Sequence, residues 1–298
     1  MISIAEWKDQ LGIIEKVKNI KTWKKHGERA PHKPLLLLLA LGKMQQKDQR
    51  ILSYIEVEKE LGDLLEVFGN SKSKPSPENP FVRLPGDGLW ELSNPDFNKI
   101  TSRKLLRSEA IKGGFPEVIY IELSKNPELV REVAEYLLDS QFPESIHEDV
   151  LMAVGLDLET RKKKSRDPKF RDTVLNAYEY RCSVCGFDVR LNNNPVALEA
   201  AHIKWHQAGG PDDIQNGIAL CSMHHKLFDR GVFTINNSGI LLVSERANGS
   251  SGFEEWLMSF HNKAIRAPIH PNYYPRESFV RWHLKEVFRG DSRFSGGG

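Results

Sequence analysis

The first half of the chain alternates between apolar stretches that predict helices or strands and polar stretches that predict loops. A leucine-rich run at 35–41 follows Pro34, and proline is well placed in the first turn of a helix, so we expect a buried helix over 34–47. The apolar stretch 51–54 predicts a short strand, and apolar residues at helical spacing predict a second helix over 55–68.

Turn-forming residues divide the rest of this half. The Ser-, Pro- and Asn-rich stretch 69–80 predicts a loop. Two short apolar runs, 81–84 and 89–92, flank a Pro-Gly-Asp-Gly turn and predict a β-hairpin. Asn126, which proline follows directly, is a suitable cap for a helix over 127–139.

The chain is long enough for two domains. It has 298 residues, and domains usually contain about 100–200. The polar and charged stretch around 151–168 marks the expected linker between a first domain at 1–150 and a second at 169–294. Near the end of the chain, an amphipathic segment predicts a helix in which His283 has a packing role.

Composition narrows the class of protein. Hydrophobic residues make up 40% and charged residues 28%, which is typical of a globular protein and not of a disordered one. The longest apolar run has seven residues, far fewer than the roughly 20 that span a bilayer. The N-terminus lacks the layout of a signal peptide, and an odd cysteine count argues against a disulfide framework, so we expect a cytoplasmic location.

Basic residues cluster although the net charge is only +2. Residues 161–171 contain seven basic side chains against one acidic, and residues 16–33 contain seven against one. Such clusters can neutralise phosphates, and they are equally typical of a solvated helix face or linker.

All three cysteines have the spacing of metal ligands. Cys182 and Cys185 are two residues apart, and the same interval separates Cys221 from His224. Three thiolates and one imidazole can hold one tetrahedral zinc ion. With four protein ligands the zinc would be structural, because no position is open to a substrate. The alternatives are inert buried cysteines and a redox cysteine pair, for which the surrounding βαβ pattern is missing.

The segment between these ligand pairs resembles the HNH, or ββα-metal, nuclease family. The family pattern is a strand that ends in a catalytic histidine, a loop with an asparagine, and a helix with a metal-binding histidine. His202, Asn216 and His225 match these positions, over a resemblance that covers about residues 170–245. It implies that His202 is the general base, that Asn216 fixes the loop and that His225 binds the catalytic metal, Mg²⁺ or Mn²⁺.

A second ligand for the catalytic metal is expected from the same helix. Asp229 lies four residues after His225, so the two side chains would share a helix face, although Asp229 also fits an ordinary surface acid. Many family members carry a metal ligand directly before the base histidine, where this chain has Ala201. Glu199 is a further candidate, but strand alternation directs it away from His202.

Two segments of the first half, 29–34 and 79–90, resemble the sulfur-binding domain of phosphorothioate-dependent restriction endonucleases. That domain holds DNA in which sulfur replaces one non-bridging phosphate oxygen. The resemblance implies a small apolar pocket with surrounding contacts to phosphates or bases. The implied DNA-binding residues are Arg29, Pro31, His32, Lys33, Pro80, Phe81 and Arg83.

The sequence as a whole predicts an α+β protein. A mixed helix and hairpin DNA-binding domain would precede a zinc-stabilised ββα-metal HNH nuclease domain. We expect a restriction-type endonuclease that acts on phosphorothioated double-stranded DNA, with no membrane partner. Double-strand cutting by one site per chain favours a homodimer. Two alternatives remain open: an HNH endonuclease that recognises a methylated or otherwise modified base, and a zinc-containing DNA-binding protein that does not cut.

Overall fold

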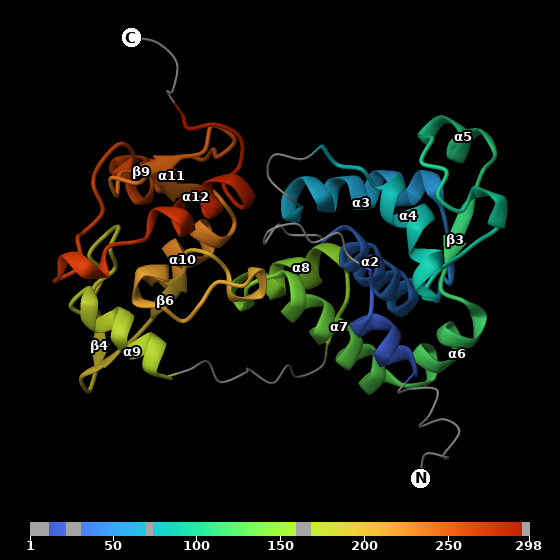
Figure 1. The fold of residues 1–298 in the computed structure, drawn as a ribbon, viewed down its shortest axis with the longest axis horizontal. Helices are drawn as coiled ribbons and strands as arrows, with labels where there is room; N and C mark the ends of the chain where they lie inside the picture. The colour runs from blue at the N-terminus through green and yellow to red at the C-terminus, as the bar shows by residue number, and fades with distance from the viewer. Residues whose placement is uncertain (1–11, 22–30, 70–73, 159–167, 294–298) are drawn as a thin grey trace. The chain divides into compact units, whose positions relative to one another are not determined.

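The computed structural model describes residues 12–21, 31–69, 74–158 and 168–293 (Figure 1). The chain divides into two compact units, Met1–Arg161 and Lys162–Gly298. Throughout the described ranges, every helix is too short or too polar to span a membrane.

The N-terminal unit is built around the leucine-rich helix α2 (His32–Lys47). All seven residues at 35–41 are buried, so side chains on every side of this helix meet protein. The helix contacts α3 (Tyr54–Phe68) and α7 (Pro127–Gln141), and it lies between them in Figure 1. The three helices confirm the sequence predictions, and each extends the predicted range by one or two residues.

Local hydrogen bonds explain where two of these helices begin. Ser53 and Glu56 form a capping box, in which each side chain accepts a hydrogen bond from the other's backbone N–H. The Asn126 side chain accepts from the backbone N–H of Leu129 at 3.1 Å, as the sequence predicted for the start of α7. Both caps satisfy donors that the first helical turn leaves unpaired.

A small antiparallel sheet covers one end of the unit. Its strands are ordered β1 (Ile51–Ser53), β3 (Lys112–Gly114) and β2 (Glu91–Leu92). The strand predicted at 51–54 is therefore confirmed. Gly113 is required at this place, because an added Cβ would lie 2.5 Å from the Trp90 ring nitrogen.

The predicted hairpin at 81–92 is wrong. Its first run lies in α4 (Glu78–Arg83), which continues into the 3₁₀ turn η1 (Leu84–Asp87). A short apolar run does not distinguish helix from strand, and Pro80 is tolerated in the first turn because its missing N–H has no helical partner there. Only β2 from the second run is a strand, and it pairs with β3 instead. The loop predicted over 69–80 therefore ends where α4 begins.

The chain stays packed beyond residue 150. Helix α8 (His147–Val154) contacts α2, and Val150, Val154 and Leu156 are buried. Val154 and Leu156, which the sequence placed in the linker, thus complete the N-terminal core because their side chains are buried in it. The other elements of this unit are α5 (Arg103–Ser108), α6 (Glu117–Lys125), η2 (Pro95–Phe97) and η3 (Glu144–Ile146).

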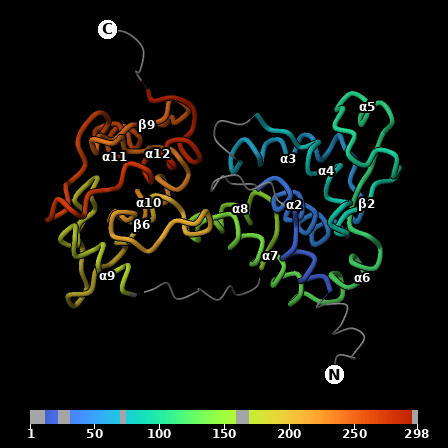
Figure 2. The backbone as a smooth tube through the Cα atoms, viewed as in Figure 1, coloured from blue at the N-terminus to red at the C-terminus, as the bar shows by residue number. Residues whose placement is uncertain are grey.

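The C-terminal unit centres on an antiparallel pair of strands, β6 (Leu198–His202) and β7 (Gly217–Cys221). Helix α9 (Pro168–Ala177) and helix α10 (Ser222–Asp229) both contact β6, which lies between them in Figure 2. Because successive strand residues alternate between faces, β6 can present different side chains to each helix. Strand, strand and helix thus follow each other as the sequence predicted.

A hairpin and α12 (Glu277–Glu286), the last helix that the structure describes, pack against α10. Strands β8 (Phe233–Ile235) and β9 (Leu241–Val243) pair, and α12 packs on β8. His283 of α12 is fully buried and stacks on Phe228 of α10 with ring centroids 3.7 Å apart. The remaining elements are β4 (Arg190–Leu191), β5 (Asn194–Pro195), α11 (Ser251–Trp256), η4 (His206–Ala208), η5 (Ile214–Asn216), η6 (Met258–Phe260) and η7 (Pro271–Tyr273).

Candidate active site and metal cluster

The four expected zinc ligands meet in the C-terminal unit. The ligand atoms of Cys182, Cys185, Cys221 and His224 all lie within 4.8 Å of one another. In a tetrahedral zinc site with Zn–S bonds of about 2.3 Å, sulfurs are separated by roughly 3.8 Å, so the cluster has the right size. His224 directs Nδ1 at the Cys221 sulfur, 3.1 Å away, while its Nε2 donates to the Trp256 carbonyl at 2.9 Å.

This environment is suited to a cation. A metal-bound histidine usually donates its other N–H to a carbonyl or carboxylate, which fixes the ring for ligation. The neighbouring Cys185 and Cys221 thiols lower the pKa of Cys182, so the cluster readily supplies a thiolate. The residues therefore fit a structural zinc ion, and the inert-cysteine alternative leaves this arrangement unexplained.

His202 is held in a defined orientation at the end of β6. Its ring stacks on Phe170 of α9 with centroids 4.1 Å apart and planes 13° apart. Its Nε2 lies 2.7 Å from the Asp212 carboxylate. The opposite residue on β7 is Gly217, where an added Cβ would lie 2.4 Å from Val174, so glycine allows α9 to approach the histidine.

Asn216 closes the loop that follows His202. Its side-chain oxygen accepts from the Lys204 backbone N–H at 2.8 Å, and its Nδ2 donates to the carbonyls of Lys204 and Pro211 at 3.0 and 2.9 Å. Its own carbonyl accepts from the backbone N–H of Ile203 at 2.8 Å. A fully buried amide with this many partners fixes the loop and is not aimed at a metal.

His225 lies between two carboxylates. Its Nδ1 is 2.5 Å from Glu199 of β6, and its Nε2 is 3.1 Å from Asp229, one turn further along α10. Burial alone would lower the pKa of His225, but the Asp229 and Glu199 carboxylates outweigh it and raise the pKa to about 9. The imidazole is therefore oriented from both sides.

The two carboxylates differ in exposure, which decides what each can do. The Asp229 side chain is 1% exposed, and its other oxygen accepts from the Trp205 indole N–H at 2.9 Å. The Glu199 side chain is 41% exposed and accepts from the Ser222 hydroxyl at 2.7 Å. Asp229, expected as the second metal ligand, is thus buried, and Glu199, the further candidate, is the carboxylate that solvent can reach.

The two N-terminal motifs lie together. The Lys33 ammonium, at the start of α2, is 2.5 Å from the Asp87 carboxylate in η1 and donates to the Lys21 carbonyl at 2.9 Å. The Lys33 side chain is 13% exposed and that of Asp87 only 3%. Lys33, expected to contact DNA, thus joins the two motifs to each other.

Other expected DNA-binding residues are placed differently. Phe81 is fully buried, and its ring packs edge-on between Tyr54 and Trp90, so it is a core residue and cannot line an open pocket. Arg83, the last residue of α4, is exposed. The remaining four residues are Pro31 and Pro80, which are buried, His32, which is half-buried, and Arg29, which lies outside the described residues.

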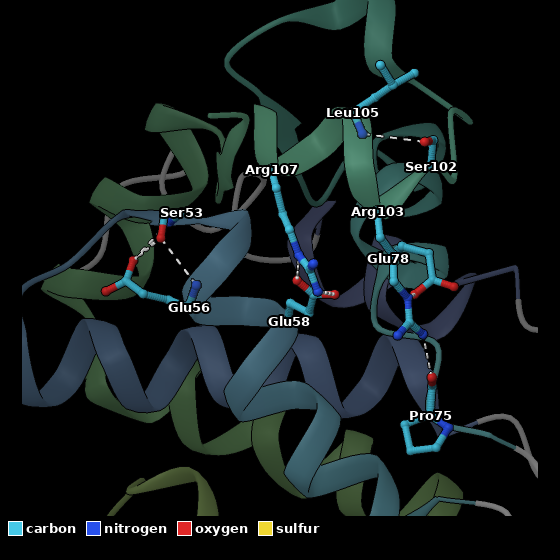
Figure 3. A network of polar contacts seen from close by, with 9 residues as sticks. All are labelled: Ser53, Glu56, Glu58, Pro75, Glu78, Ser102, Arg103, Leu105 and Arg107. Atoms are coloured by element: carbon cyan, nitrogen blue, oxygen red, sulfur yellow. Dashed lines mark hydrogen bonds and ion pairs between the residues drawn. The ribbon is translucent and has the colours of Figure 1, made fainter. Parts of the chain in front are cut away.

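Two further arginines near these motifs have protein partners (Figure 3). Arg107 of α5 forms two hydrogen bonds to the Glu58 carboxylate, at 2.5 and 2.7 Å. Arg103 bonds Glu78 of α4 at 2.8 Å and the Pro75 carbonyl at 2.6 Å. These pairs connect α5 to α3 and α4, so the two guanidinium groups have structural roles.

The sequence pattern that defines the ScoMcrA-like DNA sulfur-binding domain matches residues 10–159. The chain belongs to this family. A second pattern, that of the HNH endonucleases, matches residues 182–236 and thus spans the Cys₃His cluster and all three HNH positions. The C-terminal unit is therefore an HNH endonuclease domain, and the chain is a DNA endonuclease.

Several solved structures are similar to parts of the chain. The sulfur-binding domain of ScoMcrA complexed with phosphorothioated DNA is 21% identical, with a TM-score of 0.43 over 48% of this chain and 94% of that one. The corresponding SprMcrA complex is 23% identical, with a TM-score of 0.44 over 51% and 96%. The Type IV phosphorothioation-dependent restriction endonuclease ScoMcrA is 20% identical, with a TM-score of 0.40 over 52% of this chain and 33% of its own length. Among curated proteins, no significant match was found.

Sequence reasoning missed two contacts in the nuclease domain. Both come from the loop between β6 and β7: Asp212 contacts His202, and Trp205 contacts Asp229. Loop residues have no periodicity that would reveal which side chain they meet. A Gly-Gly-Pro turn followed by two aspartates was visible, but it gave no sign of which carboxylate faces the histidine.

Proposed function

We propose that this chain is a restriction-type endonuclease that binds phosphorothioated DNA and hydrolyses phosphodiester bonds near the modification. The observation that carries the proposal is the presence, in one chain, of a sulfur-binding family match and an HNH family match. One domain would select the DNA and the other would cut it. We further propose that the enzyme works in the cytoplasm, where its DNA substrate lies.

Sulfur recognition has a simple physical basis. Sulfur is larger than oxygen and less well hydrated, so transferring it from water into a cavity of matching size makes the binding free energy more favourable. Full burial of a small apolar group contributes about 1.5–3 kcal/mol, which corresponds to roughly 10- to 150-fold in affinity. Contacts to the other phosphates would add affinity that is independent of sulfur and decreases with salt.

The DNA contacts are proposed around the junction of the two N-terminal motifs. Arg29, His32 and Arg83 would hold phosphates or base edges, and Pro31 with Pro80 would shape the apolar wall. Phe81 would support that wall from the core. Lys33 would act chiefly through its ion pair with Asp87, which holds the start of α2 against η1.

In the nuclease domain, His202 would be the general base that activates water, and Asn216 would keep its loop in place. A catalytic Mg²⁺ or Mn²⁺ would be held by His225 Nδ1 and the exposed Glu199. It would offset the charge of the phosphate and the leaving oxygen. Glu199 shares a face of β6 with Ala201, where many HNH nucleases carry a ligand. Asp229 would orient His225 through Nε2, as carboxylates do for metal-binding histidines.

A structural Zn²⁺ is proposed at Cys182, Cys185, Cys221 and His224. We place the sulfur-binding domain before residue 159 and the nuclease domain after residue 167. Because one HNH site cuts one strand, we propose that two copies act together to break a duplex. Cleavage of both strands should then depend more steeply on enzyme concentration than nicking does.

The test compares matched duplexes with and without one phosphorothioate of the natural stereoisomer. The full chain should bind the modified duplex about 10- to 150-fold more tightly in fluorescence anisotropy. It should then cut the modified duplex when Mg²⁺ or Mn²⁺ is present. Equal affinity would reject sulfur recognition and favour the modified-base alternative.

A second comparison tests cutting separately from recognition. His202→Ala should retain duplex affinity and lose cleavage, because a general base stabilises the transition state and contributes little to ground-state binding. Cleavage at the wild-type rate by this variant would reject the role of His202. A wild-type protein that binds but never cuts would support the non-cleaving alternative.

A further inference from the structure

An acidic side chain in the loop after β6 contacts the histidine assigned as general base. The Asp212 carboxylate lies 2.7 Å from His202 Nε2, within the range of a charge-assisted hydrogen bond. The two residues are ten positions apart, and the contact depends on the loop that Asn216 closes. The His202 side chain is 14% exposed and that of Asp212 is 37% exposed.

The contact determines which histidine nitrogen carries the proton. A carboxylate only accepts hydrogen bonds, so Nε2 must carry the hydrogen and the lone pair lies on Nδ1. The Phe170 ring, parallel to the imidazole, limits rotation out of this plane. The other titratable group with a described ring contact is His206, whose centroid is 6.1 Å away.

We propose that Asp212 is a positioning residue for His202. Its carboxylate holds the imidazole in the Nε2–H tautomer, so that Nδ1 takes the proton from the attacking water. It also stabilises the imidazolium ion that forms when that proton arrives. The proposal rests on the role of His202 in the proposed function, but the hydrogen bond itself can be tested without cleavage.

The adjacent Asp213 provides a matched control. Its carboxylate accepts from the Gln215 backbone N–H at 3.0 Å, which caps η5, and from Arg276 at 3.2 Å. Both aspartates belong to the same loop and have the same charge, but only Asp212 has a described contact with His202. Asp213→Asn should therefore leave the pH dependence of cleavage unchanged.

Four full-length proteins are compared with wild type: Asp212→Asn, Asp212→Ala, Asp212→Glu and Asp213→Asn. Single-turnover cleavage of a phosphorothioated duplex is measured from pH 5.5 to 8.5 at saturating Mn²⁺. A hydrogen bond to a charged group corresponds to roughly 10- to 100-fold in rate, so Asp212→Asn should cut that much more slowly at pH 7.5. The acid limb of its pH–rate curve should move to lower pH, because the imidazolium ion has lost its counter-charge.

Rescue separates positioning from a general structural effect. Asp212→Glu should recover much of the rate and the wild-type acid limb, whereas Asp212→Ala should be slowest. All four proteins should retain duplex affinity. An Asp212→Asn protein with wild-type rate, or with a slower rate and an unmoved acid limb, overturns the proposal.

Imidazole NMR gives a readout that does not involve cutting. In wild type the ¹⁵N shifts of His202 should report a hydrogen on Nε2, and in Asp212→Ala they should report a mixture of tautomers. An unchanged tautomer in Asp212→Ala overturns the positioning role while leaving the proposed function intact. If instead His202→Ala cuts normally, the proposed function fails, and the NMR result still shows whether the pair exists.

Discussion

Replacing His283 by phenylalanine should remove an acid-sensitive element from the nuclease domain. The His283 ring is completely buried between α12 and α10. Its Nε2 donates to the Phe228 carbonyl at 3.1 Å, and its Nδ1 accepts from the Thr234 hydroxyl at 2.9 Å. Phenylalanine preserves the stacked ring and removes both hydrogen bonds and the titratable group.

The direction of the pH effect follows from the shifted pKa. Burial lowers the pKa of His283 from 6.5 to about 4, although Asp229 and the Phe228 carbonyl oppose the shift. Between these values the unfolded chain binds a proton that the folded state does not. The stabilising contribution is therefore complete above pH 6.5 and is lost as the pH falls to 4. At about 1.4 kcal/mol per pH unit, the total loss is about 3 kcal/mol.

At neutral pH the variant carries a different penalty. The Phe228 carbonyl keeps the Gly231 N–H as a donor at 2.9 Å, so the main penalty is the acceptor lost by the Thr234 hydroxyl, about 1–3 kcal/mol. Wild type should thus be more stable at pH 7.5 by about 2 kcal/mol, and its advantage should vanish near pH 5. The zinc ligands also titrate in acid, but they are common to both proteins and cancel in the difference.

The assay is guanidinium unfolding of both full-length proteins at half-unit steps from pH 7.5 to 4.5. Tryptophan fluorescence follows the nuclease domain through Trp205 and Trp282, whose rings pack 5.8 Å apart, and the N-terminal unit through Trp90, which is the same in both proteins. The free energy of unfolding should fall more steeply with acid for wild type. Parallel curves for the two proteins would refute the assignment of this acid sensitivity to His283.

Three further changes test other parts of the structure. Cys182→Ser should lose the bound zinc and unfold the nuclease domain while duplex binding survives, as metal analysis and circular dichroism would show; full zinc content in the variant would contradict the ligand set. Asp229→Asn should raise the Mn²⁺ concentration needed for half-maximal cleavage about 10- to 100-fold, because His225 loses its orienting carboxylate; an unchanged requirement argues against that role. Lys33→Met should lower the free energy of unfolding by about 3 kcal/mol by leaving Asp87 buried without its counter-ion, and the double variant with Asp87→Leu should recover most of it. If the double variant is no more stable to denaturant than Lys33→Met alone, the lost ion pair is not what destabilises the single variant.

Much of the nuclease site could be predicted because its chemistry is local in sequence. Cysteine spacing identified the metal cluster, and the order of His202, Asn216 and His225 along the chain identified the strands and helix that carry them. The contacts of the carboxylates could not be derived in this way. The indole of Trp205, from the loop after β6, donates to Asp229, and no pattern within β6 or α10 encodes that contact.

The N-terminal unit shows a different limit of prediction from sequence, set by the length of the apolar run. Its long helices could be predicted because each carries a signal of its own: helical spacing of apolar residues at 55–68, a leucine run after Pro34 and the Asn126 cap before 127–139. The run at 81–84 was too short to carry such a signal, and its helical state depends on burial of Phe81 between Tyr54 and Trp90. Tertiary packing decided the secondary structure there, so only the three-dimensional fold could show that Phe81 is not available to a ligand.

The stack of His283 on Phe228 also has a consequence during synthesis. A ribosome makes the chain from the N-terminus at about 5–20 residues per second, and domains tend to fold in that order. The DNA-selecting unit, which ends at Arg161, is complete before any nuclease residue emerges. The residues proposed for catalysis follow, and α12, which packs against α10 through His283, is synthesised several seconds after α10. A nascent or truncated chain that ends before residue 277 would therefore contain His202, Asn216 and His225 but lack α12, whose His283 packs against α10.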